Sequence, residues 1–256
     1  MIKYGINEYS VTPVRLEPNE RSEMITQILF GETFQILEET VKWSYIRLSF
    51  DNYIGWIDNK AITPISEDYL KSVNTNSQIV TKKLFTICFN HKKEQLILPA
   101  GSTLPGFNKK ENTFIVNENK YYIQDSLEDD KKEITELATQ FLNSPYLWGG
   151  KNPFGIDCSG FIQVIYKMLG KSLPRDAKQQ VSEGNAVNFI SDIQLGDIAF
   201  FDDIDGNIIH AGIILNKNEI IHASGKVRID KIDQQGIFNQ EIKKYTHHLR
   251  VIKRIL

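Results

Sequence analysis

Short runs rich in β-branched and aromatic residues, separated by turn residues, fill the first half of the chain. In the first 65 residues these runs lie near residues 11–15, 24–29, 33–39, 42–49 and 53–57. The runs are separated by turn-forming pairs at Pro18-Asn19, Gly31-Glu32 and Asp51-Asn52. Runs of this length and composition, bounded by such breaks, predict an all-β domain of short strands over residues 1–65.

The next segment repeats this pattern more loosely. Strand-like runs occupy residues 84–89, 95–98, 113–116 and 121–123, with turns at Pro99-Ala-Gly101 and Pro105-Gly106. The two segments share a pattern of short strands and turns but not an amino-acid sequence. This pattern predicts a second, degenerate barrel over residues 66–127. Cys88 lies inside one of the apolar runs, where we expect a small buried side chain and not a reactive thiol.

A charged run at residues 128–133 marks the change to helical spacing. Its acidic residues favour the start of a helix, which we predict over 129–143 and which Pro145 ends. The core positions of this helix are predicted to be Ile134, Leu137, Ala138, Phe141 and Leu142.

A second helix is predicted from Cys158 to Leu169, with Gly170 as its C-terminal stop. Its apolar side consists of Phe161, Ile162, Ile165, Tyr166 and Leu169. Strand-like runs follow at residues 197–201, 208–215, 219–223 and 249–252. Two helices that lead into a run of strands predict an α+β domain over residues 128–256.

Composition and charge argue against several classes of protein. The 256 residues include 30 basic and 32 acidic side chains, a formal net charge of −2, so we expect no general affinity for nucleic acid. No stretch approaches about 18 consecutive apolar residues, so no membrane span is expected. The start lacks the apolar core of a secretory signal, which favours a cytoplasmic protein over an exported one whose leader has been removed. Two cysteines do not make a disulfide framework.

Candidate chemistry gathers at the start of the second helix. Cys158 follows a glycine-rich loop that ends in Gly149-Gly150, and two histidines, His210 and His222, come later on apolar segments. At a helix start, the peptide dipoles and the unpaired N–H groups favour the thiolate over the thiol. An imidazole brought in by a neighbouring strand would complete the nucleophile–base pair of a thiol hydrolase.

Each of these residues has an alternative explanation. The alternatives are a buried structural cysteine at Cys158, a satisfied core histidine at His210, and a packing residue or metal ligand at His222. The polar neighbours Asp157 and Ser159 favour a nucleophile over a structural cysteine. The sequence holds neither His-Glu-x-x-His nor Cys-x-x-Cys, so we expect no metal site and no cofactor.

The chemistry sets a constraint on the strands that carry the histidines. Both rings must lie on one face of a hairpin whose turn contains Asn216-Lys-Asn218. An even-numbered loop would pair Ile213 with His222 and put His210 on the opposite face. A three-residue loop or a bulge pairs Gly212 with His222 instead, and the glycine leaves room for the ring. We therefore expect an odd loop or a bulge in this hairpin.

Five ordered motifs carry a family resemblance. They are Tyr146-x-Trp-Gly-Gly, Asp157-Cys-Ser-Gly-Phe161, Leu195-Gly-Asp197, His210-Ala-Gly-Ile and Ile221-His-Ala-Ser224. In this order and spacing, residues 130–256 resemble the NlpC-type bacterial cell-wall peptidases, a papain-like cysteine peptidase family. The first segment, with its closing Gly55-Trp-Ile57, resembles a bacterial SH3-like barrel.

The resemblance implies a multidomain architecture. Two small all-β SH3-like barrels, at residues 1–65 and 66–127, would precede an α+β papain-like cysteine peptidase domain at residues 128–256. This arrangement is similar to the subgroup that cleaves γ-D-glutamyl–L-diamino-acid bonds in freed muropeptides, often called dipeptidyl-peptidase VI.

The resemblance also implies roles for single residues. Cys158 would be the nucleophile, His210 the general base, and His222 the polar residue that orients the base. The Tyr146 hydroxyl would join the backbone N–H of Cys158 in stabilising the oxyanion, unless Tyr146 and Trp148 only pack under the helix. The residues expected to bind substrate are Asp157, Ser159, Asp176, Trp148, Glu23 and Tyr53.

Three of these substrate-binding residues concern a free amine. A peptide that begins with L-Ala carries an ammonium group, which is costly to bury unless carboxylates or carbonyls replace its water. Asp176 fits the family's amine-binding acid, and Glu23 in the charged loop 20–24 would supply a second carboxylate, with Tyr53 beside it. The alternatives are a solvated Arg175–Asp176 turn and an ordinary charged loop.

Three functions compete. The first is an endopeptidase that acts on short peptidoglycan peptides with a free N-terminal L-Ala and releases L-Ala-D-Glu, in murein peptide recycling. The second is a wall-binding protein with a decayed peptidase fold, which the complete set of Cys158, His210 and His222 opposes. The third is a broader peptidoglycan hydrolase or another thiol amidase or acyltransferase with wall-binding modules.

The expected partner is a small muropeptide, with no nucleic acid and no membrane, and the expected state is a monomer. The sequence leaves open whether meso-diaminopimelate or L-Lys follows the cleaved bond.

Overall fold

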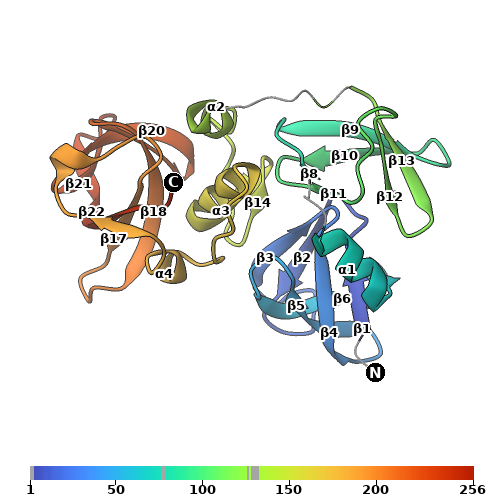
Figure 1. Cartoon of the computed structure of the whole chain (residues 1–256). Coiled ribbons are helices and arrows are strands. Elements are labelled where there is room, and N and C mark those ends of the chain that lie inside the picture. Colours follow the sequence, from blue (N-terminus) through green and yellow to red (C-terminus); the bar gives the residue numbers. More distant parts are fainter. Residues whose placement is uncertain (1–2, 76–78, 126, 128–132) are drawn as a thin grey trace. The chain divides into compact units, whose positions relative to one another are not determined.

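The computed structural model describes residues 3–75, 79–125, 127 and 133–256. It divides the chain into two compact units, residues 1–131 and 132–256, and each is described by itself (Figure 1). Most of the charged run at 128–133, with the predicted helix start, lies outside the described residues. None of the described helices is long and apolar enough to cross a membrane.

A seven-stranded antiparallel sheet in the order β3-β2-β6-β5-β4-β1-β7 curls around the first core of unit 1 (Figure 1). Its strands are β1 Lys3–Ile6, β2 Val11–Arg15, β3 Met24–Leu29, β4 Thr33–Glu39, β5 Trp43–Leu48, β6 Ile54–Asp58 and β7 Thr63–Ile65, with the 3-10 helix η1 at Asn59–Ala61. The core inside this sheet consists of Val14, Ile28, Phe34, Ile46, Leu48 and Ile57. The predicted strands match β2 to β6, whereas β1 and β7 were too short to show a pattern.

The second part of unit 1 forms a small sheet beside this first sheet. Its elements are α1 Glu67–Thr75, β8 Ile79–Val80, β9 Phe85–Asn90, β10 Gln95–Pro99, β11 Thr103–Leu104, β12 Thr113–Val116 and β13 Asn119–Ile123. They make a four-stranded sheet, β10-β9-β13-β12, and a separate pair, β11-β8.

The expected second barrel is not confirmed, because these strands form an open four-stranded sheet and a separate pair. The sheet buries its apolar face without closing on itself. That face packs onto Ile6, Phe30 and Ile65 in one shared core. Burial of the apolar residues is therefore achieved by docking rather than by closure. Cys88 is part of this core and fully buried, so the expectation of a small buried side chain is confirmed, and burial raises its pKa to about 12.

Unit 2 contains a closed antiparallel barrel (Figure 1). Its strands are β16 Asn185–Val187, β17 Ile198–Asp202, β18 Ile208–Asn216, β19 Glu219–Ser224, β20 Lys226–Asp233, β21 Gly236–Asn239 and β22 Lys244–Arg254. The order is β16-β22-β17-β18-β19-β20-β21, and an additional pairing of β22 with β21 closes the ring. The core associated with the barrel consists of Ile193, Ala199, Phe201, Ile214, Ile220, Ile232, Ile237 and Ile252.

The helices of unit 2 lie beside the barrel. They are α2 Ile134–Thr139, α3 Cys158–Met168, α4 Ala177–Gln180 and the 3-10 helix η2 Ile190–Asp192, and a small hairpin joins β14 Lys151–Asn152 to β15 Gly155–Ile156. Helix α3 packs against β18, β19 and α2, and all of its residues are buried. The predicted second helix is confirmed, and Gly170 follows it with a φ of +76°.

The first predicted helix of unit 2 is shorter than expected. Helix α2 ends at Thr139, and turns occupy the residues that follow it. Leu142 therefore falls outside the helix and is 38% exposed, so its predicted place in the core is wrong. Ile134, Leu137, Ala138 and Phe141 are buried as expected.

The hairpin of β18 and β19 has the register that the sequence predicted. Gly212 lies opposite His222, and a bulge interrupts the ladder between Ile214 and Asn216. His210 therefore shares a face with His222, two positions along the neighbouring strand. A Cβ on Gly212 would come within 2.9 Å of the His222 Cβ, so the glycine provides the room that this pairing needs.

Candidate active site

Cys158 is the first residue of α3, and it is 7% exposed. The helix is capped by Asp157, whose carboxylate accepts a hydrogen bond from the Gly160 N–H at 2.7 Å. The backbone N–H groups of Ala211 and Ser159 also interact with the sulfur. Because Ala211 directly follows His210 on β18, the thiol lies against the strand that carries the first histidine.

The Cys158 thiol is uncharged at neutral pH in this environment. Burial, followed by the negative charge of Asp157, raises its pKa to about 12, although the Ala211 N–H and Arg175 act to lower it. The expectation that the helix start would favour the thiolate is therefore wrong for the protein without substrate. Loss of water around the sulfur outweighs the helix dipole, so the proton has to be removed by a base.

Arg175 holds the Asp157 carboxylate in a buried ion pair. Its two terminal nitrogens donate to the two carboxylate oxygens at 3.0 and 2.6 Å, and Arg175 is 1% exposed. The Gly149 N–H donates to the same carboxylate at 2.8 Å, and Arg175 also donates to the Ser159 hydroxyl at 2.9 Å. Arg175 is therefore not solvated, contrary to the alternative of a solvated Arg175–Asp176 turn. Asp157 and Ser159 stabilise the start of α3, and their predicted contacts with substrate stay predictions.

The loop that precedes α3 carries Tyr146 and Trp148. Tyr146 is half-buried, and its N–H donates to the Gly225 carbonyl at 3.0 Å. Burial, followed by the charges of Cys158 and Asp157, raises the pKa of Tyr146 to about 12, so its hydroxyl keeps its proton at neutral pH. Trp148 is 61% exposed, which rules out packing under the helix for this residue. A protonated Tyr146 near Cys158 can donate a hydrogen bond to negative charge that develops there.

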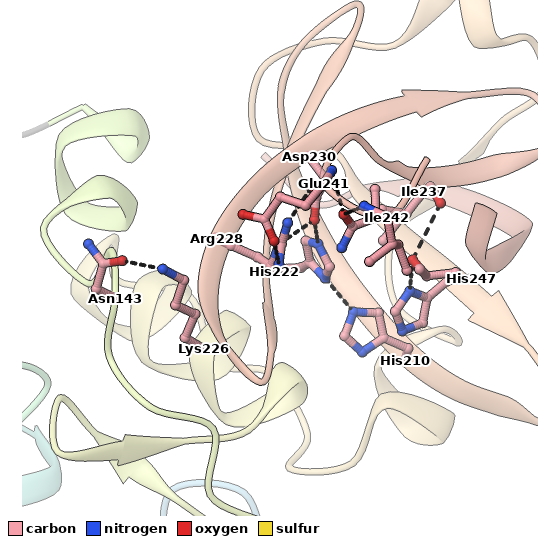
Figure 2. Close-up of polar contacts among 12 residues, drawn as sticks. Asn143, His210, His222, Lys226, Arg228, Asp230, Ile237, Glu241, Ile242 and His247 are labelled. Carbon is pink, nitrogen blue, oxygen red and sulfur yellow. Dashed lines mark hydrogen bonds and ion pairs between the residues drawn. The ribbon is translucent and has the colours of Figure 1, made fainter. Parts of the chain in front are cut away.

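His210 and His222 form a buried hydrogen-bonded pair (Figure 2). Nε2 of His210 lies 2.8 Å from Nδ1 of His222. Burial, followed by repulsion from His222 and His247, holds the pKa of His210 well below its usual range. A neutral His210 has one nitrogen without a proton, so it can accept the proton that Cys158 has to lose.

The hydrogen bonds continue beyond His222 to residues that the sequence pattern did not reveal (Figure 2). Oδ2 of Asp230 lies 3.0 Å from Nε2 of His222. Arg228 donates to both oxygens of Asp230, at 2.6 and 3.0 Å, and one of its terminal nitrogens also donates to Glu241 at 3.3 Å. The histidine pair is thus one end of a longer polar chain.

Asp230 and Arg228 were missed because β20 was not predicted. Two adjacent polar residues, Asp230 and Lys231, break the alternation of apolar positions along this strand. In the sheet, His222 lies opposite Arg228, and Ile220 lies opposite Asp230. The pairing with β19 puts both residues on the face of His222, and this information appears only once the register is known.

His247 on β22 stacks on His210, with ring centroids 4.1 Å apart and an interplanar angle of 25°. One ligand nitrogen from each of His210, His222 and His247 lies within 4.8 Å of the others, a spacing compatible with a metal ion. However, stacked rings direct their in-plane lone pairs along nearly parallel planes, and Nε2 of His210 is already bonded to His222. This geometry favours hydrogen-bonded imidazoles over a metal centre at these three residues.

The other predicted substrate-binding residues lie in different places. Asp176 directly precedes α4 and is half-buried. Glu23 and Tyr53 belong to unit 1, where Glu23 is exposed before β3 and Tyr53 packs against the core of the first sheet. The roles of all three residues in binding an amine stay predictions.

Comparison with known protein families gives two matches. Residues 143–250 match the NlpC/P60 family, and residues 14–62 match the bacterial dipeptidyl-peptidase Sh3 domain. The first match contains Cys158, His210, His222 and Asp230, and the second covers β3 to β6.

The similarity to known proteins extends over both units. The γ-D-glutamyl-L-lysine dipeptidyl-peptidase of Bacillus subtilis is 27% identical over 217 residues, which cover 77% of this chain and 71% of the relative. Dipeptidyl-peptidase 6 of Lysinibacillus sphaericus is 26% identical over 261 residues, which cover 88% and 91%. The crystal structure of an NlpC/P60 family protein from Bacillus cereus has the same fold, with a TM-score of 0.79, 19% identity and 99% coverage of both chains. The chain thus carries a cysteine peptidase domain of the NlpC/P60 family, preceded by a bacterial SH3 domain.

Proposed function

We propose that the protein hydrolyses the γ-D-glutamyl–L-diamino-acid bond of short peptidoglycan peptides with a free N-terminal L-Ala. The products are L-Ala-D-Glu and a diamino acid or a peptide that begins with one, which suits murein peptide recycling. The names of the relatives from Bacillus subtilis and Lysinibacillus sphaericus support this type of peptidase. The observation that carries the proposal is that the sulfur of Cys158 meets the Ala211 N–H, one residue from the imidazole of His210.

In the proposed mechanism Cys158 is the nucleophile, His210 the general base and His222 the residue that orients the base. His210 takes the thiol proton while the sulfur attacks the γ-carbonyl carbon of D-Glu. The C–N bond then breaks, and the proton passes from the imidazole to the leaving amine. A water molecule that gives a proton to the same imidazole hydrolyses the thioester and regenerates the thiol.

The charge states of the two groups determine the order of these events. Burial raises the pKa of Cys158 and lowers the pKa of His210, so both groups are neutral before substrate binds. Proton transfer must therefore accompany the attack of the sulfur, because no stable thiolate precedes it.

The oxyanion that forms on the γ-carbonyl oxygen needs hydrogen-bond donors. We assign this role to the backbone N–H of Cys158 and to the hydroxyl of Tyr146, which carries its proton at neutral pH. The N–H of Cys158 belongs to the first turn of α3, where backbone N–H groups have no partner inside the helix.

Hydrolysis of defined peptides tests the substrate. We expect L-Ala-γ-D-Glu-meso-diaminopimelate and L-Ala-γ-D-Glu-L-Lys to be cleaved to L-Ala-D-Glu, as detected by mass spectrometry. Cys158→Ala and His210→Ala should lower turnover on the order of 10³-fold or more, and His222→Ala less, because water can partly replace its hydrogen bond. Substantial activity in Cys158→Ala would contradict the thiol mechanism. Equal cleavage of intact peptidoglycan and short peptides would favour a broader hydrolase.

The pH dependence of alkylation tests the neutral resting pair. In a Cys88→Ala background, in which Cys158 is the one remaining thiol, the rate of reaction with iodoacetamide should still be rising above about pH 9. The raised pKa of Cys158 and the lowered pKa of His210 predict this profile. A thiolate–imidazolium pair would instead give a plateau that starts in the acidic range, and that result would contradict the prediction. The unfolded protein, with a thiol pKa of about 8.5, is the control.

Replacement of Tyr146 by phenylalanine separates catalysis from packing. Tyr146→Phe keeps the ring and removes the hydroxyl, so turnover should fall by an amount equivalent to roughly 2–4 kcal/mol while the melting temperature stays unchanged. Tyr245→Phe, at an exposed tyrosine of β22, is the matched control and should leave turnover unchanged. Normal turnover together with a lower melting temperature in Tyr146→Phe would mean that Tyr146 only packs.

Selectivity for a free amine tests the two proposed carboxylates. Asp176→Asn and Glu23→Gln should each weaken kcat/KM for the free-amine peptide by about 2–5 kcal/mol, because a buried ammonium would lose a partner. Slow cleavage of the N-acylated peptide should change little in either variant. Asp203→Asn, in the loop between β17 and β18, is the control. Equal turnover of free and acylated peptides by the unmodified protein would refute amine recognition.

A further inference from the structure

Asp230 ends a chain of hydrogen bonds that begins at His210 (Figure 2). The chain passes from His210 to His222 over 2.8 Å and from His222 to Asp230 over 3.0 Å. All three side chains lie on the inner face of the closed barrel, which Ile220 of the barrel core marks. His222 is two residues from Ile220 on β19, and Asp230 lies opposite Ile220, so both share its face. His210 is two residues from Gly212, which lies opposite His222, so it shares this face as well. Each of the three residues is at most 5% exposed, so bulk water competes little for these contacts.

The carboxylate of Asp230 determines which nitrogen of His222 carries the proton. Burial acts to raise the pKa of Asp230, but the hydrogen bonds and charges of His222 and Arg228 outweigh it, and the pKa is lowered. The group is therefore ionised at neutral pH, and an ionised carboxylate accepts hydrogen bonds without donating any. Nε2 of His222 must then carry the proton, and in a neutral ring Nδ1 is left as an acceptor.

The same requirement passes on to His210. Because Nδ1 of His222 is an acceptor, Nε2 of His210 has to donate the hydrogen bond that joins the two rings. A neutral His210 with its proton on Nε2 has an unprotonated Nδ1, which can take the proton of Cys158. The opposite tautomer would present an N–H at that nitrogen and could not act as a base.

Arg228 limits the effect of the Asp230 charge on His222. Its bidentate contact with the carboxylate, at 2.6 and 3.0 Å, supplies a counter-charge. Without it, the buried carboxylate would favour a protonated His222. A protonated His222 carries a proton on both nitrogens, so it would donate to Nε2 of His210 and force the His210 proton onto Nδ1.

We propose that Asp230, held by Arg228, is a positioning residue that sets the tautomer of His222 and thereby keeps Nδ1 of His210 unprotonated. The inference rests on the catalytic roles proposed above for Cys158 and His210. It assigns to β20 a task that the two histidines cannot perform alone. In an isolated pair of neutral imidazoles, either ring can donate the hydrogen bond that joins them, so neither tautomer is fixed.

Two further ionisable residues border this chain. Glu241 accepts from Arg228 at 3.3 Å and is exposed, so its charge is screened by water. His247 faces both rings of the histidine pair, and burial, followed by repulsion from His222, lowers its pKa to about 4. His247 is therefore neutral above about pH 5, so a change of activity above that pH does not come from its titration.

Nitrogen-15 NMR of the imidazoles tests the tautomers without any substrate. In the unmodified protein at about pH 7, both His210 and His222 should carry their protons on Nε2. In Asp230→Asn the amide can turn its NH₂ toward His222, so the protons of both rings should move to Nδ1. Asp233→Asn makes the same replacement at an exposed position of β20 and should leave both tautomers unchanged. An Asp230→Asn protein whose His210 keeps its proton on Nε2 would overturn the proposal.

Turnover measures the consequence for the reaction. Asp230→Asn should lower kcat by about 10²–10⁴-fold with little change in KM, by analogy with the loss of the orienting carboxylate in a Ser-His-Asp triad. Arg228→Met keeps the carboxylate but removes its counter-charge. Activity should therefore be retained at alkaline pH, and as the pH falls it should be lost at a higher pH than in the unmodified protein. Arg228→Lys keeps the positive charge and should restore the pH profile in part.

These readouts separate a failure of this inference from a failure of the proposed function. If the tautomers are as expected but no peptide is cleaved, the proposed substrate is wrong and the assignment of Asp230 stands. If Asp230→Asn lowers the melting temperature but leaves kcat and the pH profile unchanged, Asp230 is structural and the inference is wrong. Should Asp230→Asn fail to fold, an unchanged pH profile in Arg228→Met would overturn it equally.

Discussion

In the hairpin of β18 and β19, Gly212 lies opposite His222, and the polar contacts of the site depend on this register. A shift by one residue would turn His222 to the other face of its strand and break its contacts with both His210 and Asp230. The bulge between Ile214 and Asn216 makes the pairing compatible with the short turn that follows. Closure of the barrel by β21 and β22 then holds β18 and β19 between paired neighbours on both sides.

Two arginine–aspartate pairs support the two halves of the site. Arg175 pairs with Asp157, which caps the helix that presents Cys158. Arg228 pairs with Asp230, which bonds to His222. Carboxylates this deeply buried are stable only when opposite charges and hydrogen-bond donors replace their water. The same burial keeps the thiol and His210 neutral, so the low-dielectric setting that demands these pairs also determines how the proton moves.

Local strand patterns predicted most of unit 1, but they did not predict how its strands combine. The runs at 84–89, 95–98, 113–116 and 121–123 correspond to β9, β10, β12 and β13. Whether four strands close into a barrel depends on what covers their apolar face, and here Ile6, Phe30 and Ile65 from the first sheet cover it. Such a contact joins residues far apart in the chain, so no local pattern records it.

For the site, the sequence by itself determined which residues start α3 and which histidines share a hairpin, because helix starts and strand runs follow from nearby residues. Strand parity left two registers for this hairpin, and the requirement that both rings share a face selected the one in which Gly212 opposes His222. Tertiary structure alone decided the rest. The neutral thiol of Cys158 depends on burial, which the helix-start pattern cannot report. Asp230 and Arg228 belong to a strand whose pattern two adjacent polar residues conceal, and only the pairing of β19 with β20 brings them to His222. Periodicity is local, whereas desolvation and cross-strand contacts depend on segments distant in the chain.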